Sequence, residues 1–323
     1  MAKQLTLPPL LTCFALTVGI TACHAREARF PQLPPGSAQN PLITDAQPAA
    51  RTPQATSAPQ TPLPGVLWPS DSQALAERII RAQSRRLNDN QRQPAGDALI
   101  ALARSFLGAP YKAFSLDGPG AERLLVDLHR FDCFLFVEQI LALFKARSTP
   151  EMERLILSLR YGDRQVSFCN RFHYFTLWAQ NAERSGWLHN LSPEFQGVSI
   201  RRRHLNYISQ HSAAYAPMRT ARNRQCVSKQ EAALVVNQSY IPIDQLGPIL
   251  PLLNNGDIFG LVTDVDGLDV THVGFIEKTG PHTVNAIHAA PHGGVVRSVG
   301  LADWAARVPD VVGLALYEPI VKP

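Results

Sequence analysis

The 323-residue sequence lacks several features that would place it in a common class of protein. It has no HExxH run and no CxxC pair, so neither of these zinc-binding patterns is present. No internal repeat or central linker divides the chain. The basic residues are scattered, with residues 201–203 as the only tight run, which we interpret as a solvated loop. The formal net charge of +5 therefore does not indicate nucleic acid binding.

The first apolar segment is too short for an ordinary membrane span. Residues 5–20 are almost uncharged and mostly apolar, which is typical of a secretion signal. Residues 20–23, Ile-Thr-Ala-Cys, resemble a bacterial lipobox. We therefore predict a lipoprotein signal peptide at residues 1–22 and lipidation of Cys23.

The residues that follow predict where the protein is anchored. His24 stands where Asp would favour the inner membrane, so we expect a periplasm-facing lipoprotein of the bacterial cell envelope, held by its lipid in the outer membrane. The alternative is ordinary signal cleavage after Ala25. Residues 23–69 are rich in Pro, Ala, Gln, Ser and Thr and predict a disordered tether, and residues 70–323 predict one folded domain.

Cys133 follows a turn-forming Asp132 and precedes a strongly apolar stretch. This pattern predicts a thiol at the first turn of a buried helix. Unpaired N–H groups and the helix dipole favour the thiolate there, which is the form that attacks a carbonyl carbon. His272 lies in a predicted strand far downstream and is the candidate general base. Together the two residues suggest a cysteine hydrolase.

The five cysteines divide by position. Cys13 belongs to the signal and Cys23 to the anchor. In an oxidising compartment, the remaining three suggest one disulfide and one working thiol. The context of Cys133 assigns it as the thiol, so we predict a disulfide between Cys169 and Cys226.

The predicted fold class is α+β, with helices preceding a mainly antiparallel sheet. Caps, apolar runs and breakers define the elements. We expect helices at 72–87, 97–107, 133–144, from 149 onward and at 171–184, and strands at 257–263, 271–277, 283–289 and 311–317.

A hairpin centred on Gly280 pairs residues whose numbers sum to 560. His272 then lies opposite His288 on one face, so His288 is the candidate to orient the His272 ring. A slip of one residue in the register would turn His288 to the other face and make Asn285 or Ile287 the residue to consider in its place.

At this point the motifs resemble a known family. Four runs resemble the NlpC-type superfamily of papain-like bacterial cell-wall hydrolases, and four more resemble its N-acetylmuramoyl-L-alanine amidase-like branch. The first four are LGAPY at 107–111, FDC at 131–133, HVGF at 272–275 and IHA at 287–289. The others are FVE at 136–138, RFHY at 171–174 with Trp178, SYIP at 239–242 and GDI at 256–258.

The resemblance implies a papain-like fold whose nucleophile helix packs on the sheet. It makes Cys133 the nucleophile, His272 the base and His288 the orienting residue. Tyr111 would lie beside the nucleophile as a supporting residue, while Asp132 is expected to cap the helix. The activity implied is hydrolysis of the amide between N-acetylmuramic acid and L-alanine in peptidoglycan or muropeptides.

Other residues bear on the substrate. We expect Arg171, His173 and Tyr174 to line the cleft, with Arg171 pairing a stem-peptide carboxylate. Phe134 and Leu135 depart from the family pattern, which usually has small hydroxyl residues, and could narrow the pocket. We expect no cofactor and a monomer.

Three alternatives remain. The same machinery could be an endopeptidase that cuts between D-glutamate and the diamino acid of the stem peptide. A zinc site could form from His272, His288 and His292, or from Cys169 and His173. The chain could also be a non-catalytic lipoprotein that binds peptidoglycan.

Overall fold

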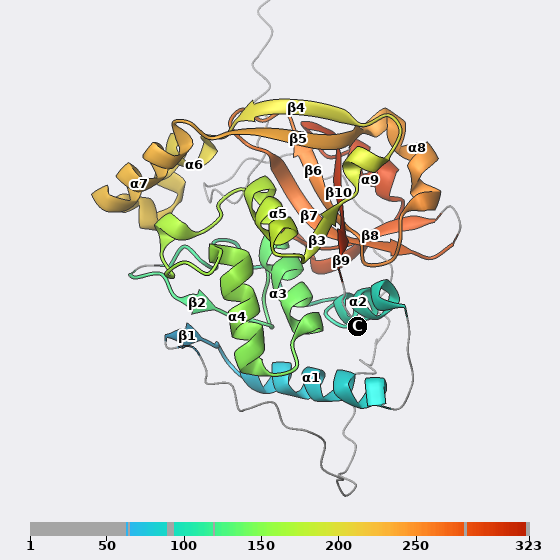
Figure 1. The fold of residues 1–323 in the computed structure, drawn as a ribbon, viewed down its shortest axis with the longest axis horizontal. Helices are drawn as coiled ribbons and strands as arrows, with labels where there is room; N and C mark the ends of the chain where they lie inside the picture. The colour runs from blue at the N-terminus through green and yellow to red at the C-terminus, as the bar shows by residue number, and fades with distance from the viewer. Residues whose placement is uncertain (1–62, 64, 89–93, 119, 281–282, 321–323) are drawn as a thin grey trace, which may run out of the picture.

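The computed structural model describes residues 63, 65–88, 94–118, 120–280 and 283–320 (Figure 1). The predicted signal peptide at residues 1–22, the lipidation site Cys23 and the predicted tether up to residue 62 lie outside these residues. No helix in the described ranges is both long and apolar enough to cross a bilayer.

The end of the predicted tether belongs to the fold. Strand β1 (Val66–Leu67) pairs in parallel with β2 (Leu124–Leu125). The Trp68 indole donates a hydrogen bond to Glu153 at 2.9 Å, and the backbone N–H of Leu63 donates to the same carboxylate at 2.8 Å. The prediction that the tether extends to residue 69 is therefore wrong for these residues, because their apolar side chains pack against the core.

Helices occupy the first part of the described chain and strands the last part (Figure 1). Helix α3 is central and packs against α1, α2 and α4 and against strands β7 and β8. The longer helices are α1 (Ser72–Asn88), α2 (Ala95–Arg104), α3 (Cys133–Lys145), α4 (Thr149–Tyr161), α5 (Phe175–Arg184) and α7 (Ala221–Glu231), and the short ones are α6 (Tyr207–Gln210), α8 (Leu246–Ile249) and α9 (Leu301–Ala306).

Eight strands of the described chain form one antiparallel sheet. Its order is β4-β5-β10-β6-β7-β8-β9, with β3 pairing β10 in addition. The strands are β3 (Leu188–Asn190), β4 (Ser199–His204), β5 (Val235–Pro242), β6 (Ile258–Thr263), β7 (Val270–Lys278), β8 (Val284–Ala290), β9 (Gly294–Ser298) and β10 (Val311–Pro319). This arrangement confirms the predicted α+β class with an antiparallel sheet.

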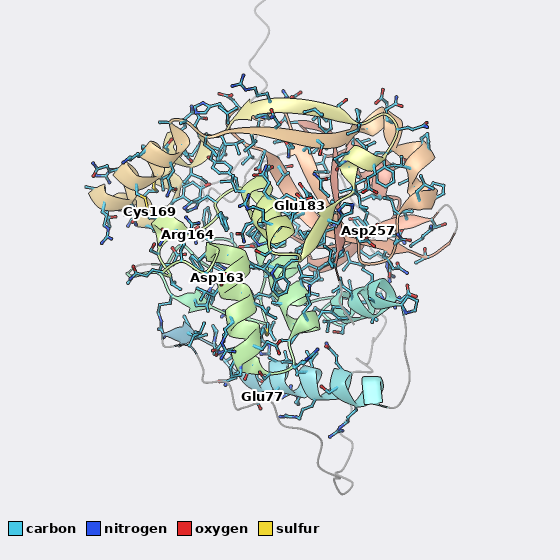
Figure 2. The ribbon with its side chains drawn as sticks, in the orientation of Figure 1. Glu77, Asp163, Arg164, Cys169, Glu183 and Asp257 are labelled. Atoms are coloured by element: carbon cyan, nitrogen blue, oxygen red, sulfur yellow. A yellow bond between two sulfur atoms is a disulfide. The ribbon has the colours of Figure 1, made fainter. Side chains whose placement is uncertain are left out.

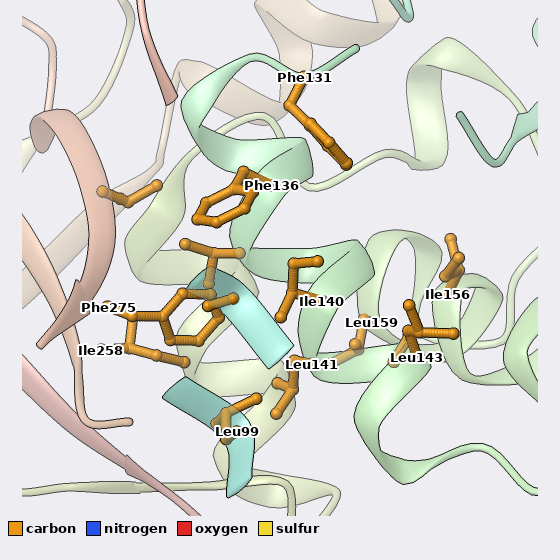
Figure 3. Close-up of a cluster of buried hydrophobic side chains, with 14 of the residues drawn as sticks. Leu99, Phe131, Phe136, Ile140, Leu141, Leu143, Ile156, Leu159, Ile258 and Phe275 are labelled. Carbon is orange, nitrogen blue, oxygen red and sulfur yellow. The ribbon is translucent and has the colours of Figure 1, made fainter. Parts of the chain in front are cut away.

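Alternation along the strands gives the sheet two apolar faces. Phe275 belongs to the cluster shared with α2, α3 and α5, while Ile276 belongs to a second cluster with α8 and α9. Figure 3 shows Phe136 of α3 and Phe275 of β7 in the first cluster, and their rings meet edge to face at 5.7 Å. Burying each such side chain contributes about 1.5–3 kcal/mol, so α3 is held firmly on the sheet.

A buried ion pair also holds α3. Glu138 of α3 accepts a hydrogen bond from Nε of Arg160 at 2.8 Å, and both side chains are fully buried. Arg160 of α4 also donates to the backbone carbonyl of Leu125 at 3.0 Å. The contact joins α3, α4 and β2, so it fixes the helix that begins at Cys133.

The structure departs from the predicted elements at several places, and helix α2 ends at Arg104 rather than at residue 107. Helix α5 begins at Phe175 rather than at residue 171, because residues 168–170 form a separate 3₁₀ turn and Arg171 is extended. Residues 201–203 lie in strand β4, and Arg203 is buried with a 2.7 Å hydrogen bond to the Thr263 carbonyl. The interpretation of these arginines as a solvated loop is therefore wrong. The alternation of residues in β4 turns Arg203 inward while Arg202 faces solvent.

The predicted disulfide is confirmed. Cys169 and Cys226 are bonded, and Cys133 is free. The disulfide joins the 3₁₀ turn before Arg171 to helix α7, and Cys169 lies beside α7 in Figure 2. The bond therefore fixes a small apolar cluster that includes Phe168 and Val227, at a distance along the chain from Cys133.

Candidate active site

The nucleophile candidate occupies the predicted position. Cys133 is the first residue of α3 and is partly exposed. The Asp132 carboxylate accepts a hydrogen bond from the backbone N–H of Leu135 at 2.7 Å, which confirms Asp132 as the helix cap. The cap satisfies one of the unpaired N–H groups of the first turn, and it fixes where the helix begins.

The electrostatics of the thiol differ from the expectation. Burial, followed by the charge of Asp132, raises the pKa of Cys133 to about 12. The backbone N–H groups of Val273, Phe134 and Cys133 itself act in the opposite direction, because they point at the sulfur and favour the thiolate. Desolvation is the larger effect, so the resting group at neutral pH is a thiol and needs a base.

The two histidines meet across adjacent strands. Nε2 of His272 in β7 lies 2.7 Å from Nδ1 of His288 in β8. The predicted hairpin register was wrong by two positions: Phe275 pairs with Ile287, so paired numbers sum to 562 rather than 560. Because strand side chains alternate with a period of two, this shift leaves both histidines on the same face as diagonal neighbours.

Close packing makes this contact possible. A Cβ on Gly274 would lie 2.8 Å from Cβ of His288 and 2.7 Å from Cζ of Phe259. Only a residue without a side chain lets the two strands carry the histidines this close. The Trp304 ring of α9 covers the pair, with its centroid 4.6 Å from that of His288 and 6.0 Å from that of His272.

A third residue contacts the second histidine on its other ring nitrogen. Nε2 of His288 lies 2.8 Å from the hydroxyl oxygen of Ser298, the last residue of β9. Sequence reasoning missed Ser298, Gly274 and Trp304. The GVVRS run could have suggested a third strand beside β8, but nothing local indicates that a serine at its end meets His288.

Burial keeps both imidazoles neutral. It lowers the pKa of His272 to about 4. It also lowers the pKa of His288 well below the usual value, and the charge that His272 would carry lowers it further by a smaller amount. Nδ1 of His272 makes no hydrogen bond to another described residue, so it is the nitrogen left for a proton from Cys133. The side chains of Cys133 and His272 form no direct hydrogen bond here, although the backbone N–H of Val273, the next residue after His272, lowers the pKa of the Cys133 thiol.

Tyr111 lies close enough to influence the thiol. Its pKa is raised by burial and by the charges that Cys133 and Asp132 would carry. Its backbone forms a bridge to Phe131, two residues before the nucleophile. The structure therefore places Tyr111 beside Cys133, where the family resemblance expects it.

The two unusual residues after the nucleophile serve the core. Phe134 meets the rings of Trp178 at 5.4 Å and of Phe175 at 6.2 Å, and Leu135 is fully buried. The suggestion that they narrow the substrate pocket is not supported by this placement, because Phe134 packs against α5 and Leu135 is fully buried.

The three residues predicted to line a substrate cleft have partners within the protein. Arg171 is buried and forms an ion pair with Asp117. Nε2 of His173 lies 2.8 Å from the carbonyl oxygen of Phe168. The Tyr174 hydroxyl is buried and donates to Glu231 at 2.6 Å. All three side chains also line a cavity of about 220 Å³ beside α7, and the Arg171 guanidinium there is already paired with the internal carboxylate of Asp117.

The zinc alternatives lose some of their ligands. The disulfide removes the Cys169 thiolate that would have joined His173. Within the described residues, no group of three His, Cys, Asp or Glu side chains is arranged to hold a metal ion.

A cavity of about 640 Å³ lies away from these residues, between the start of α2 and the ends of β7 and β10, where Asp257 lies in Figure 2. Cys133 is not among its lining residues.

Comparison with known proteins identifies a family for most of the described chain. The family model described as AmiA-like, N-acetylmuramoyl-L-alanine amidase-like, matches residues 101–306, a range that includes Cys133, His272, His288 and Ser298. No functionally curated protein is similar enough to be matched to the chain.

Several solved structures share the fold. An N-acetylmuramoyl-L-alanine amidase from Bacteroides uniformis matches with a TM-score of 0.66 and 25% identity, covering 70% of this chain and 99% of that one. A proposed xylanase from Bacteroides fragilis matches with a TM-score of 0.63 and 28% identity, covering 68% and 99%. A Legionella pneumophila protein has a TM-score of 0.61 over 77% and 97% of the two chains, and at 19% identity this likeness concerns the fold alone.

Proposed function

The chain belongs to the N-acetylmuramoyl-L-alanine amidase-like family, and from this premise we propose that it cleaves the amide between N-acetylmuramic acid and L-alanine by a Cys-His-His thiol mechanism. The observation that carries the mechanism is the 2.7 Å contact between His272 and His288 beside a free thiol at a helix N-terminus. A base, its orienting partner and a nucleophile are the parts that such catalysis requires.

The first half of the reaction forms a thioester. Nδ1 of His272 takes the Cys133 proton as the sulfur attacks the lactyl carbonyl carbon of the muramic acid. The carbonyl oxygen becomes an oxyanion, which the backbone N–H of Cys133 stabilises. The proton on His272 then passes to the departing nitrogen, so L-alanine leaves as the amine of the free stem peptide.

The second half restores the enzyme. His272, neutral again, takes a proton from a water molecule that attacks the thioester carbon. The C–S bond breaks, and the imidazolium returns its proton to the Cys133 sulfur. The products are the resting thiol and the muramic acid carboxyl group, which ionises by releasing the second water proton to solvent, and no metal or cofactor is required for the balance.

The pKa values of the site suit a mechanism in which His272 acts as a general base and removes the Cys133 proton during the attack. Burial raises the pKa of Cys133 to about 12 and lowers that of His272 to about 4, so both groups are neutral at pH 7. A neutral imidazole can accept the thiol proton at the moment of attack, whereas a resting ion pair would need no such step. Hydrogen bonds at active sites often tighten only with bound substrate, which is consistent with the lack of a direct Cys133–His272 bond here.

The cellular setting of the proposal rests on the sequence. We propose an NlpC-type, papain-like enzyme that is lipidated at Cys23, faces the periplasm from the outer membrane and acts as a monomer. Residues 23–62 lie outside the described residues, and the tether that the sequence predicts there would let a membrane-anchored domain reach nearby peptidoglycan.

Two other functions use the same fold. An endopeptidase would attack the bond between D-glutamate and the diamino acid with the same three residues, and a non-catalytic lipoprotein would bind peptidoglycan without cleavage. Glycoside hydrolysis, suggested by the name of one neighbour, uses a pair of carboxylates, whereas a thiol and two imidazoles form this site.

A defined muropeptide tests the proposal. The full chain is incubated with a disaccharide-tetrapeptide, beside Cys133→Ala and His292→Ala, and the products are identified by mass spectrometry. A free tetrapeptide beginning with L-alanine, absent with Cys133→Ala and retained with His292→Ala, is the expected result. A shortened stem would support the endopeptidase, loss of activity in His292→Ala would support the zinc alternative, and no cleavage by the folded wild type would contradict the amidase proposal.

A further inference from the structure

A third hydrogen-bonding group follows the two histidines. The contacts run from Nε2 of His272 to Nδ1 of His288 at 2.7 Å, and from Nε2 of His288 to the hydroxyl of Ser298 at 2.8 Å. The three residues come from three neighbouring strands, β7, β8 and β9, so the sheet itself aligns them.

The proton positions along this chain are linked. A neutral imidazole carries one proton, so one ring nitrogen donates and the other accepts. For Nδ1 of His272 to accept a proton from Cys133, the ring must carry its own proton on Nε2 and donate it to Nδ1 of His288. His288 must then carry its proton on Nε2, which needs an acceptor of its own.

We propose that Ser298 is a positioning residue whose hydroxyl oxygen accepts the Nε2 proton of His288 and thereby holds both histidines in the tautomers that leave Nδ1 of His272 free to act as base. This inference rests on the proposed thiol mechanism. Ser298 touches neither the thiol nor the substrate, and it acts only through His288.

Burial makes the acceptor necessary. His288 is 3% exposed, and Trp304 covers its ring, so water has little access to Nε2. A buried N–H without an acceptor is unfavourable by an amount that corresponds to roughly 5- to 150-fold in an equilibrium. Without the serine oxygen, the His288 proton can move to Nδ1, which then opposes the Nε2–H of His272 and drives that ring to the unproductive tautomer.

The strand that carries Ser298 is fixed at several points. The N–H of Gly108 donates to the carbonyl of Val295 at 2.8 Å, and the N–H of Val295 donates to the carbonyl of Ala109 at 2.8 Å. Arg297 forms a two-point ion pair with the buried carboxylate of Glu277 on β7. The loop that leads to Tyr111 and the strand that ends at Ser298 are therefore held as one unit around the histidines.

Substitutions of matched shape isolate the hydroxyl. Ser298→Thr keeps the oxygen and adds a methyl group, while Ser298→Val has nearly the same shape without the oxygen, and Ser298→Ala removes the oxygen without adding bulk. The readout is the rate at which iodoacetamide alkylates Cys133 in the folded full chain, measured between pH 5 and 9 by mass spectrometry of the peptide that contains Cys133. Alkylation needs the base but no cell-wall substrate.

The expected pattern compares three rates at neutral pH. Ser298→Val and Ser298→Ala lower the rate about tenfold, and Ser298→Thr stays within about threefold of the wild type. Equal rates for the Thr and Val variants would overturn the proposal, because the hydroxyl would then be irrelevant. A wild-type rate in Ser298→Ala would overturn it as well.

The muropeptide assay completes the test. With the amidase substrate, Ser298→Val is expected to lower kcat about tenfold and to leave KM nearly unchanged, since the serine does not contact substrate. If the wild type cleaves no muropeptide but the alkylation rates follow the expected pattern, the amidase proposal fails and the role of Ser298 stands. If the wild type cleaves muropeptide and the alkylation rates of the variants are equal, the amidase proposal stands and the proposed role of Ser298 fails.

Discussion

Replacing Gly274 with alanine tests whether close strand packing holds the two histidines together. The added Cβ would lie 2.8 Å from Cβ of His288 and 2.8 Å from the carbonyl oxygen of Ile287. An ordinary carbon–carbon contact is about 3.5 Å, so the strands must separate by roughly 0.7 Å. The His272–His288 contact of 2.7 Å would then lengthen beyond the usual limit of about 3.2 Å for a hydrogen bond.

The magnitude follows from two opposing effects. Overpacking costs about 1–3 kcal/mol, and the lower chain entropy of unfolded alanine offsets about 0.5–1 kcal/mol. The net loss of unfolding free energy is therefore about 0–2.5 kcal/mol, which lowers Tm by at most roughly 10 °C for a domain of this size. The loss of an oriented base should slow Cys133 alkylation far more, by about tenfold to a hundredfold.

The assay is the same iodoacetamide reaction at neutral pH, with thermal unfolding followed in parallel. Gly247→Ala is the matched control, because its added Cβ meets no atom within 4 Å. It should leave the alkylation rate near the wild-type value and raise Tm by roughly 1–4 °C, because the chain-entropy gain is not offset by overpacking. A folded Gly274→Ala protein that is alkylated at the wild-type rate would show that the histidine contact does not govern the thiol, and the reasoning would be wrong.

The remaining predictions concern the pKa values of His272 and Cys133 and the buried hydroxyl of Tyr174. Burial lowers the pKa of His272 to about 4, so the unfolded chain binds a proton there below about pH 6.5 while the folded protein does not. Stability from this group is full above that pH and should decline as pH falls from about 6.5 to 4, which urea unfolding at several pH values would detect. Asp132→Asn keeps an oxygen for the cap but removes the charge that raises the pKa of Cys133, so the pH midpoint of alkylation should move down, and an upward or absent shift would contradict this. Tyr174→Phe removes the hydroxyl bonded to buried Glu231 and should lower the unfolding free energy by about 1–3 kcal/mol with little change in KM, whereas a large rise in KM would restore its predicted role at the substrate.

The sequence alone identified the parts of the site that depend on near neighbours. Asp132 followed by an apolar run predicted a capped helix starting at Cys133, and the cap bond to Leu135 is present. Two β-branched runs around a turn placed His272 and His288 on one face, and that face survived a two-residue error in register because side chains alternate with a period of two. The count of cysteines and the context of Cys133 were enough to predict the disulfide.

Only the tertiary structure decided what surrounds those residues. Ser298 and Trp304 reach the histidines from a separate strand and helix, and no local pattern encodes such a meeting. Desolvation depends on everything packed around a group, so the pKa of Cys133 rises although its helix position favours the thiolate. Arg171 was expected at the substrate, and the fold supplied Asp117 as its partner. A sequence specifies its helix starts and strand faces through short-range contacts, whereas burial, charge pairing and the last members of a hydrogen-bonded chain arise only when distant segments pack.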